Sequence, residues 1–315
     1  MPSVDITQAH EVFLGDKPTY IREVVALDPS LYYLTQEEAA FFKAVTGIDH
    51  DDELKAHILM TQEKAYKASC NPSFFSVAPY PCIYGFGFLR MGIMNRPGYE
   101  DFIKIGRERK DAIFLDIGCC FATDARKAAI DGFPAHNIIA SDLREEFLEL
   151  SHILFRTSKD TWPAHFIPGD AFDPAMLSVV PPARGPKQEP PPDLSTLTSL
   201  NPLHGHCSVI NAAAFFHLFD EERQLHLARA LAGLLSPDSG STICGFQVGS
   251  KEKGSFPQEL KGARHEVFAH SPKSWEEMWS GMVFEKGEVQ VRTELIETMF
   301  LDIQAEFLSW SITRL

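Results

Sequence analysis

Three acidic residues stand where short apolar runs of the 315-residue sequence end. Asp116 belongs to the run FLDIGCCFA, Asp142 ends the run NIIASD, and Asp170 follows the run FIPG. Small residues after Asp116 would let a turn approach a ligand closely, and a helix that begins there would present free N–H groups. Asp142, at the end of the second run, could accept hydrogen bonds from ribose hydroxyls. Asp170, beside small and aromatic residues after the third run, could contact an adenine. The three runs together predict a site for an adenosyl group.

Each run is also compatible with a structure that binds nothing. The first fits an ordinary strand–turn–helix corner, and the third fits a plain turn. Asp142 precedes a predicted helix that begins at Arg144, so its side chain could cap that helix instead of binding a ribose.

The elements that must position these acids are those of a parallel α/β sheet. From Ala112 onward, β-branched runs alternate with helical stretches, which is typical of this fold class. The predicted strands are Ala112–Ile117, Asn137–Ser141, Ala164–Ile167, Ser208–Ala212 and Thr242–Val248. The predicted helices between them are Thr123–Asp131, Arg144–Ser158 and Glu221–Leu235. Glu294–Met299 and Glu306–Arg314 have only a short break between them, so they predict an antiparallel hairpin.

The chain divides into a cap and a core. We expect residues 1–105 to form a helical cap with a lid loop, and residues 106–315 to form the ligand-binding core. A proline-rich stretch at 181–192 predicts an exposed insertion in that core. The lid is expected at residues 80–90, where aromatic side chains would wall an apolar pocket and glycines would let the loop move. The same aromatic residues could instead pack the cap against the sheet.

Two helices of the cap have clear boundaries in the sequence. Thr35 and Glu38 have the spacing of a capping box, which predicts a helix that Gly47 ends. A second helix is predicted at Asp51–Ser69, and Gly98–Arg109 predicts a third that leads into the core.

Composition and charge limit the possible partners. The formal net charge of −14 opposes binding to a nucleic acid, whose phosphates are also negative. No apolar run reaches the about 18 residues of a membrane span, and the N-terminus does not resemble a secretory signal. The six cysteines form no CxxC pair, so we expect reduced thiols, a cytoplasmic protein and no metal site. No feature of the sequence indicates an oligomeric state.

The series of strand ends resembles the class I S-adenosylmethionine (SAM)-dependent methyltransferases, over residues 106–315. The runs LDIGCCF at 115–121 and AAFFHLF at 213–219 are similar to methyltransferases of fungal secondary metabolism, including the terpenoid and meroterpenoid branch. The runs PYPCI, FQVGS and HSPKSW fit that branch too. The resemblance implies a Rossmann-like class I methyltransferase sheet with an antiparallel C-terminal hairpin and an N-terminal helical cap. The chain departs from the D-x-G-x-G-x-G pattern at Cys120 and Ala122, where the pattern has glycine.

The resemblance also implies roles for individual residues, with SAM as the cofactor. The residues implied at the methionine end, the ribose and the adenine are Asp116, Gly118, Cys119, Cys120, Asp142, Leu143, Gly169, Asp170, Ala171 and Asn211. The residues implied around the substrate are Tyr84, Arg90, Phe216 and Trp275, and Arg90 or Tyr84 could also engage the cofactor carboxylate. The fourth strand ends in NAAA, without the Asn/Asp-Pro-Pro-aromatic run of many enzymes that methylate base amines, which again argues against DNA or RNA.

His217 is the candidate catalytic residue. It follows the fourth strand, where the fold would bring a substrate near the methyl group. A hydroxyl substrate gains from a general base, whereas a carboxylate is already ionised at neutral pH and needs none. His217 could equally be a structural histidine that packs among aromatic side chains.

The resemblance therefore implies a methyltransferase that acts on a small molecule. Together with the 24 Phe of the chain, it makes O-methylation of an apolar carboxylic acid of terpenoid or polyketide origin the leading hypothesis. The alternatives are O-methylation of a phenol or alcohol, and N-methylation of a small amine. An NAD(P)-dependent oxidoreductase on a Rossmann sheet would share Asp142, but the turn after Asp116 lacks the expected glycines and no Tyr-x-x-x-Lys pair is present. A non-enzymatic module is a further alternative, although such a module need not keep all three acids.

Overall fold

The computed structural model describes residues 10–13, 18–21, 26–69, 80–185, 190–260, 263–300 and 303–315. Cys70, residues 71–79 before the predicted lid and residues 186–189 of the proline-rich insertion lie outside these described residues.

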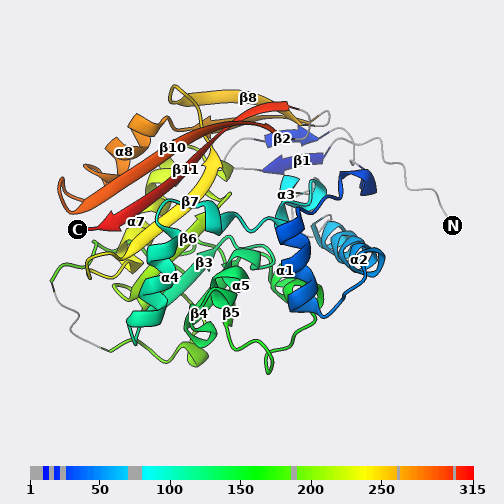
Figure 1. Ribbon diagram of the computed structural model, residues 1–315. Helices are drawn as coiled ribbons and strands as arrows, with labels where there is room; N and C mark the ends of the chain where they lie inside the picture. Colours follow the sequence, from blue (N-terminus) through cyan, green and yellow to red (C-terminus); the bar gives the residue numbers. More distant parts are fainter. Residues whose placement is uncertain are drawn as a thin grey trace.

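A seven-stranded mixed sheet forms the centre of the molecule, in the order β10-β11-β7-β6-β3-β4-β5 (Figure 1). The strands are β3 (Ile113–Ile117), β4 (Ile138–Asp142), β5 (His165–Pro168), β6 (Cys207–Ala213), β7 (Thr242–Val248), β10 (Val289–Phe300) and β11 (Ile303–Arg314). Strands β5, β4, β3, β6 and β7 are parallel, whereas β11 is antiparallel to both β7 and β10. The predicted α/β fold with a terminal antiparallel hairpin is confirmed.

Helices cover both faces of this sheet (Figure 1). The helices on the sheet are α4 (Tyr99–Glu108), α5 (Thr123–Ile130), α6 (Glu145–Leu154), α7 (Glu221–Leu234) and α8 (Pro272–Trp279). Helices α1 (Gln36–Thr46), α2 (Asp51–Ser69) and α3 (Pro81–Tyr84) belong to an apolar cluster without strand residues. Because side chains alternate along a strand, Leu115 packs with α7 and α8 on one face while Phe114 packs with α4 and α5 on the other. The strands are buried on both faces, as their continuous apolar runs predict.

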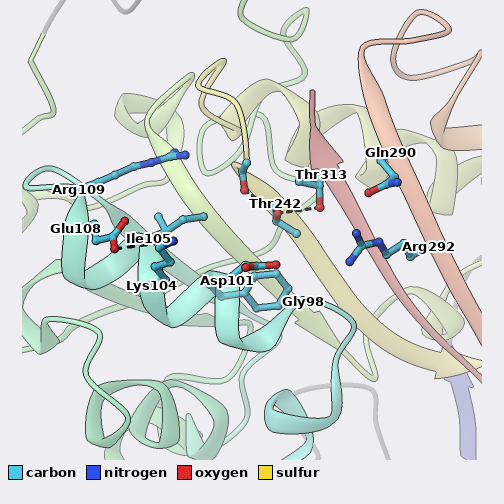
Figure 2. Close-up of a pocket in the computed structure, with 12 residues that line it drawn as sticks. Gly98, Asp101, Lys104, Ile105, Glu108, Arg109, Thr242, Gln290, Arg292 and Thr313 are labelled. Atoms are coloured by element: carbon cyan, nitrogen blue, oxygen red, sulfur yellow. Dashed lines mark hydrogen bonds and ion pairs between the residues drawn. The ribbon is translucent and has the colours of Figure 1, made fainter.

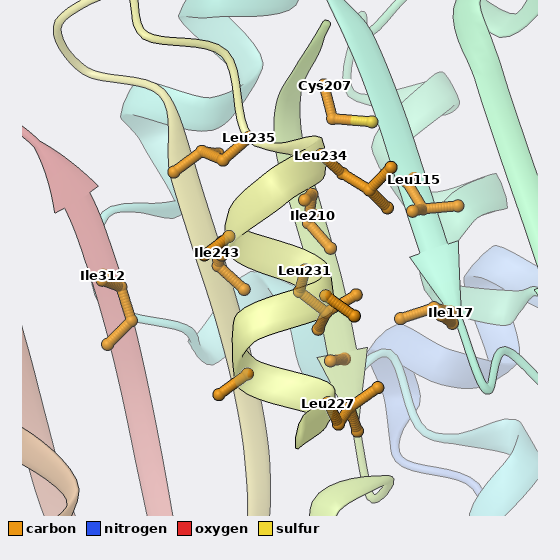
Figure 3. Close-up of a cluster of buried hydrophobic side chains, with 14 of the residues drawn as sticks. Leu115, Ile117, Cys207, Ile210, Leu227, Leu231, Leu234, Leu235, Ile243 and Ile312 are labelled. Atoms are coloured by element: carbon orange, nitrogen blue, oxygen red, sulfur yellow. The ribbon is translucent and has the colours of Figure 1, made fainter. Parts of the chain in front are cut away.

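Helix α7 shows how the sequence forms this layered core. Leu227, Leu231 and Leu234 lie at helical spacing on its inner side, where they pack toward Ile210 of β6 and Ile243 of β7 (Figure 3). All five side chains are completely buried. This packing fixes the sheet strands whose carboxyl ends carry the predicted site.

The N-terminal cap packs on the core through its own apolar cluster. The capping box of α1 is present, with Thr35 accepting the N–H of Glu38 and the Glu38 carboxylate accepting the N–H of Thr35. Gly47 ends the helix with a φ of 66°, as predicted. Helix α2 contacts α6 of the core, where His57 Nε2 lies 2.9 Å from the carbonyl oxygen of Leu154. The cap is therefore attached next to β4 and β5, beside two of the predicted strand ends.

Four elements go beyond the sequence-based expectations. Strands β1 (His10–Phe13) and β2 (Pro18–Ile21) form one antiparallel pair, and β8 (Gly254–Leu260) and β9 (Ala263–Ala269) form another. The run GSFPQEL of β8 contains glycine and proline, which disfavour a strand in the middle of a sheet but are compatible with a two-stranded ribbon. The terminal hairpin is also longer than predicted, since its two strands begin five and three residues before the expected ones.

Candidate functional site

The carboxyl ends of β3, β4, β5 and β6 bring the predicted acids to one edge of the sheet. Asp116 is in register with Ala140 of β4 and with Asn211 of β6, and Asp142 is in register with Pro168 of β5. The N–H of Gly169 donates to the carbonyl oxygen of Asp142, with 3.0 Å between N and O. The three strand ends thus meet as the sequence predicts.

The turn after β3 adopts the conformation that a glycine-rich loop would have. The φ angles are 66° at Gly118, 52° at Cys120 and 56° at Ala122, all in the left-handed region. These are the positions at which the family pattern has glycine. A non-glycine residue in this region is strained, by an amount on the order of 1–2 kcal/mol. The chain therefore keeps the backbone of the glycine-rich turn although two of its three glycines are replaced.

Asp142 ties this turn to the next strand end. Its Oδ2 accepts the backbone N–H of Cys120 at 2.8 Å, and its Oδ1 accepts the N–H of Arg144 at 2.9 Å. The N-cap residue of α6 is Arg144, so Asp142 lies two residues before the N-cap and is not itself the cap. Burial raises the pKa of Asp142 to about 6, against the effect of these two hydrogen bonds. Each carboxylate oxygen retains a further lone pair for a ligand hydroxyl.

A buried polar network lies under the turn. Nδ2 of Asn211 donates to Oδ1 of Asp116 at 2.9 Å and to Oδ2 of Asp124 at 3.2 Å. Burial raises the pKa of Asp116 well above its usual range, and the negative charge of Asp124 raises it further. Oδ2 of Asp116 is buried and has no hydrogen-bond partner among the described residues. Asn211 therefore joins β6 to the turn and holds two acids close together.

Arg96 lies beside this polar network, although the sequence analysis did not predict it as a site residue. It lies between the 3-10 helix at Gly92–Asn95 and α4, and its side chain is buried, with 8% exposed. Its guanidinium lies over the ring of Phe246 near the end of β7, 4.6 Å from the ring centroid. Burial lowers the pKa of Arg96, while the Asp124 carboxylate opposes this shift. An arginine before a proline carries no sequence signal of such a position.

The predicted adenine side of the site combines exposed and packed residues. Leu143 is 57% exposed, which is unusual for a leucine directly after a buried strand. Asp170 is exposed and its Oδ1 accepts the N–H of Phe172 at 2.9 Å. Ala171 is almost buried, and Gly169 has no room for a side chain because a Cβ there would lie 2.7 Å from Sδ of Met176. An exposed leucine beside a carboxylate offers an apolar surface and an acceptor to a planar ligand.

Cys119 and Cys120 form the middle of the turn and are half-buried. The N–H of Cys119 donates to the carbonyl oxygen of Ser141, with 3.2 Å between N and O. Burial raises the pKa of both thiols well above its usual range, so neither is a thiolate at neutral pH. Their predicted part in the site is thus a contact of the backbone or of a neutral thiol.

His217 follows β6 in the 3-10 helix at Phe216–Leu218 and is half-buried. The residue two positions earlier, Phe215, reaches back over the turn after β3, because a Cβ on Gly118 would lie 2.7 Å from Cδ2 of its ring. The segment that carries His217 therefore lies against the predicted cofactor turn. The catalytic role of His217 stays a prediction.

Phe216 and Trp275 lie in the core. Both side chains are completely buried, and their ring centroids are 5.0 Å apart in an edge-to-face arrangement. The rings of Trp279 and Trp310 complete this aromatic cluster. Their packing gives Phe216 and Trp275 a structural role, and their predicted contact with a substrate stays a prediction.

The two predicted substrate residues of the lid have partners inside the cap. Arg90 forms an ion pair of 2.5 Å with Glu38, and it donates to the carbonyl oxygen of Tyr33. Tyr84 is 5% exposed, and its carbonyl oxygen accepts a hydrogen bond from the Gln62 side chain. These contacts hold the lid to α1 and α2, and they favour an anchoring role for Arg90.

A hollow of ≈ 280 Å³ lies at the opposite edge of the sheet (Figure 2). Its walls include α4 and the residues Thr242, Gln290, Arg292 and Thr313. Thr242 begins β7, which is parallel to β3, so the hollow is at the amino ends of the parallel strands. It does not include the strand-end acids.

In the described part of the chain, no helix is long and apolar enough to cross a membrane. Within the same residues, no group of three or more His, Cys, Asp or Glu side chains could hold a metal ion.

Comparison with known proteins places the chain among methyltransferases. Residues 27–89 match a family model described as the meroterpenoid methyltransferase N-terminal domain. The chain is 32% identical to the O-methyltransferase phiE of a fungal species over 223 residues, which are 69% of this chain and 65% of that relative. It is 30% identical to the asnovolin E/chermesin D methyltransferase nvfJ of Aspergillus novofumigatus over 213 residues, covering 68% of this chain and 67% of that relative.

The match thus spans just under two thirds of the length of phiE. Among solved structures, a SAM-dependent methyltransferase from Mesorhizobium loti is similar with a TM-score of 0.41 and 14% identity, over 71% of this chain and 100% of that one.

Proposed function

Because the chain belongs to the class I methyltransferases of fungal terpenoid-type secondary metabolism, we propose that it transfers a methyl group from SAM to an oxygen atom of an apolar small molecule. A carboxylic acid is the preferred substrate class. The observation that carries the proposal is the hydrogen bond from the N–H of Cys120 to Asp142, because it joins the turn after β3 to the acid after β4. We propose that the ligand touching both is an adenosyl group with a chain at its 5′ side.

The residues present fit this cofactor. The left-handed turn at Gly118–Ala122 leaves backbone close to a ligand, and Oδ2 of Asp116 is a buried acceptor without a partner in the described part of the chain. The exposed Leu143 offers a surface for an adenine ring. The residues that would hold the methionine end, the ribose and the adenine are Asp116, Gly118, Cys119, Cys120, Asn211, Asp142, Leu143, Gly169, Asp170 and Ala171.

When bound, SAM supplies an electrophilic methyl group on a sulfonium and a neutral thioether as the leaving group. The protein must align the acceptor oxygen and exclude water. We propose that the cap expected at residues 1–105 covers this edge of the sheet through its described residues 26–69 and 80–105. A carboxylate acceptor needs no base, so His217 would orient the substrate or, for a hydroxyl substrate, accept its proton.

The acceptor atom is inferred from the relatives, the apolar acid from the relatives and the 24 Phe of the chain, and the exclusion of nucleic acids from the charge. The matched family model is that of a meroterpenoid methyltransferase, and phiE is named an O-methyltransferase, which favours oxygen over nitrogen as the acceptor atom. The net charge of −14 opposes a nucleic-acid substrate. Because the chain belongs to the methyltransferases, the oxidoreductase alternative is wrong. The cytoplasmic location of the protein stays a prediction.

The test is a turnover assay with SAM and matched sets of apolar carboxylic acids, phenols and amines. We expect products that gain one methyl group from the acids, and alkali should hydrolyse them because they are methyl esters. Products that resist alkali would identify the acceptor as a phenol, alcohol or amine instead. A protein that binds S-adenosylhomocysteine but methylates no member of any set would count against catalysis on small molecules.

A further inference from the structure

Two buried polar atoms of opposite character lie without partners at the turn after β3. One is the acceptor Oδ2 of Asp116, and the other is the donor Nε of Arg96; neither has a hydrogen-bond partner among the residues that the structure describes. The side chains are 2% and 8% exposed. A buried N–H donor such as Nε of Arg96 is costly when it has no acceptor.

The two side chains belong to one connected network. Asn211 bonds both Asp116 and Asp124, and Asp124 accepts the N–H of Ile93 from the same 3-10 helix that precedes Arg96. A Cβ on Gly92 would lie 2.6 Å from Nη2 of Arg96 and 4.0 Å from Oδ2 of Asp124. Buried acids and a buried guanidinium therefore stand next to each other at the entry of α5.

We propose that Arg96 binds a carboxylate, and that this carboxylate belongs to the amino-acid end of the cofactor. The inference rests on the proposed function. The amino-acid end of SAM is a zwitterion, with an ammonium and a carboxylate on one carbon atom. Asp116 offers an acceptor to the ammonium and Arg96 offers donors to the carboxylate, so one ligand group satisfies both partnerless atoms.

The surroundings of Arg96 favour the cofactor over an acidic substrate as the source of the carboxylate. Arg96 is held between Asp124, at the entry of the helix after the cofactor turn, and Phe246 near the end of β7. This is the side of the turn to which the family pattern assigns the methionine end. A contact of the guanidinium with the Phe246 ring also holds it in place when no carboxylate is bound.

The proposal gives the cap a second task. Arg96 precedes α4 and lies outside the core that the sequence assigned to cofactor binding. The guanidinium already lies against Phe246 of β7, so a cofactor carboxylate bound to it would link this part of the cap to the sheet. The cap would then contribute to the cofactor site and not only to the substrate pocket.

The experiment compares SAM with decarboxylated SAM, which keeps the ammonium and the adenosyl group but lacks the carboxylate. Isothermal titration calorimetry gives the affinity ratio of the two ligands for the wild type and for Arg96→Met. We expect the wild type to prefer SAM by about 10- to 100-fold, as for a charge-assisted hydrogen bond, and Arg96→Met to lose most of this preference. Its affinity for decarboxylated SAM should stay within about threefold of wild type.

Arg126→Met is the matched control. Arg126 is a second buried arginine on aromatic rings, but Ser151 and Thr157 bond it on the other side of α5. Its replacement should leave the affinity ratio unchanged even if the protein is less stable. Gly92→Ala keeps Arg96 but should displace its guanidinium. We expect this variant also to lower the preference for SAM over decarboxylated SAM. It replaces Arg96→Met in the experiment if that variant does not fold.

The possible results separate the two proposals. If Arg96→Met weakens both ligands equally, Arg96 is only structural and the inference is wrong. If both affinities are unchanged and only the KM of an acidic substrate rises, the carboxylate belongs to the substrate and the assignment to the cofactor is wrong. If the wild type binds neither ligand, the proposed function itself fails.

Discussion

The ring of Phe215, two residues after β6, lies against the backbone of Gly118, directly after β3. A Cβ built on Gly118 would come within 2.7 Å of Cδ2 and 2.9 Å of Cγ of that ring. Two strand ends that are far apart in the sequence thus meet without space for one methyl group. The glycine is required at this position both by its φ of 66° and by the neighbouring ring.

Gly118→Ala should therefore destabilise the protein more than a left-handed conformation alone explains. Gly47 is the matched control, because its φ is also 66° but nothing lies within 4 Å of a Cβ there. We expect Gly47→Ala to cost about 1 kcal/mol of unfolding free energy and Gly118→Ala about 1–3 kcal/mol more. Urea denaturation of both variants measures the difference, and equal losses would mean that Phe215 moves away freely.

Replacing Ala122 with glycine should be nearly neutral. Ala122 has a φ of 56° and is completely buried, so glycine relieves roughly 1 kcal/mol of backbone strain while it removes a buried methyl group worth about 0.8 kcal/mol. Ala128 is equally buried inside α5, where glycine brings no such relief. We expect Ala128→Gly to cost about 1.5–2 kcal/mol in thermal or urea unfolding. Similar losses for the two variants would show that the turn at Ala122 is not strained.

The affinity for S-adenosylhomocysteine should depend on pH through Asp142. Its pKa is raised to about 6, and the ionised carboxylate is the better acceptor for ribose hydroxyls. Affinity should be full well above pH 6 and should fall as the pH is lowered through 6, by at most about tenfold per unit. Asp116 and Asp124 also have raised pKa values, so the informative quantity is the difference between wild type and Asp142→Asn.

Asp142→Asn keeps one oxygen acceptor but cannot change its charge. Calorimetry between pH 5 and 8 gives the affinity of each protein at each pH. The affinity of Asp142→Asn should therefore change less with pH than that of the wild type. Superimposable pH profiles would remove Asp142 from the ligand contacts and leave it as a link between the turn and α6.

Arg90 should act as an anchor of the lid. Its partner Glu38 is buried, whereas the Arg90 side chain is 37% exposed, so the ion pair is worth about 1 kcal/mol after screening by solvent. We expect Arg90→Ala and Glu38→Gln to lower stability by similar amounts, and the double variant to lose little more than either alone. Both should change the KM of the substrate equally; a rise in KM confined to Arg90→Ala would instead support its predicted substrate contact.

The parallel sheet and its strand ends were predictable because each depends on residues close together in the sequence. The run around Asp116 predicts a buried strand followed by a tight turn, and the structure has both. The terminal hairpin was equally predictable from two strand patterns with a short break. Local patterns of this kind do not depend on the rest of the fold.

The remaining parts of the site depend on contacts between distant segments. Asn211 reaches Asp116 across a separation of 95 residues, and Arg96 reaches Phe246 of β7 from the cap. Phe216 and Trp275 could be recognised as aromatic but not as members of the core, since only the fold decides which apolar side chains are covered. The ion-pair partner of Arg90 is Glu38, which lies 52 residues earlier in the sequence, in α1.

The most direct test of the central claim is the affinity of S-adenosylhomocysteine for wild type, Asp142→Ala and Asp193→Ala, measured by isothermal titration calorimetry. Asp193 is the control, because it accepts the N–H of the residue two positions ahead as Asp142 does, but it lies in the loop before β6. The account predicts that the wild type binds the ligand, that Asp193→Ala binds equally well, and that Asp142→Ala loses about 1–3 kcal/mol of binding free energy. A wild type that does not bind, or an Asp142→Ala variant that folds and binds as tightly as the wild type, would contradict the claim that these strand ends hold an adenosyl group.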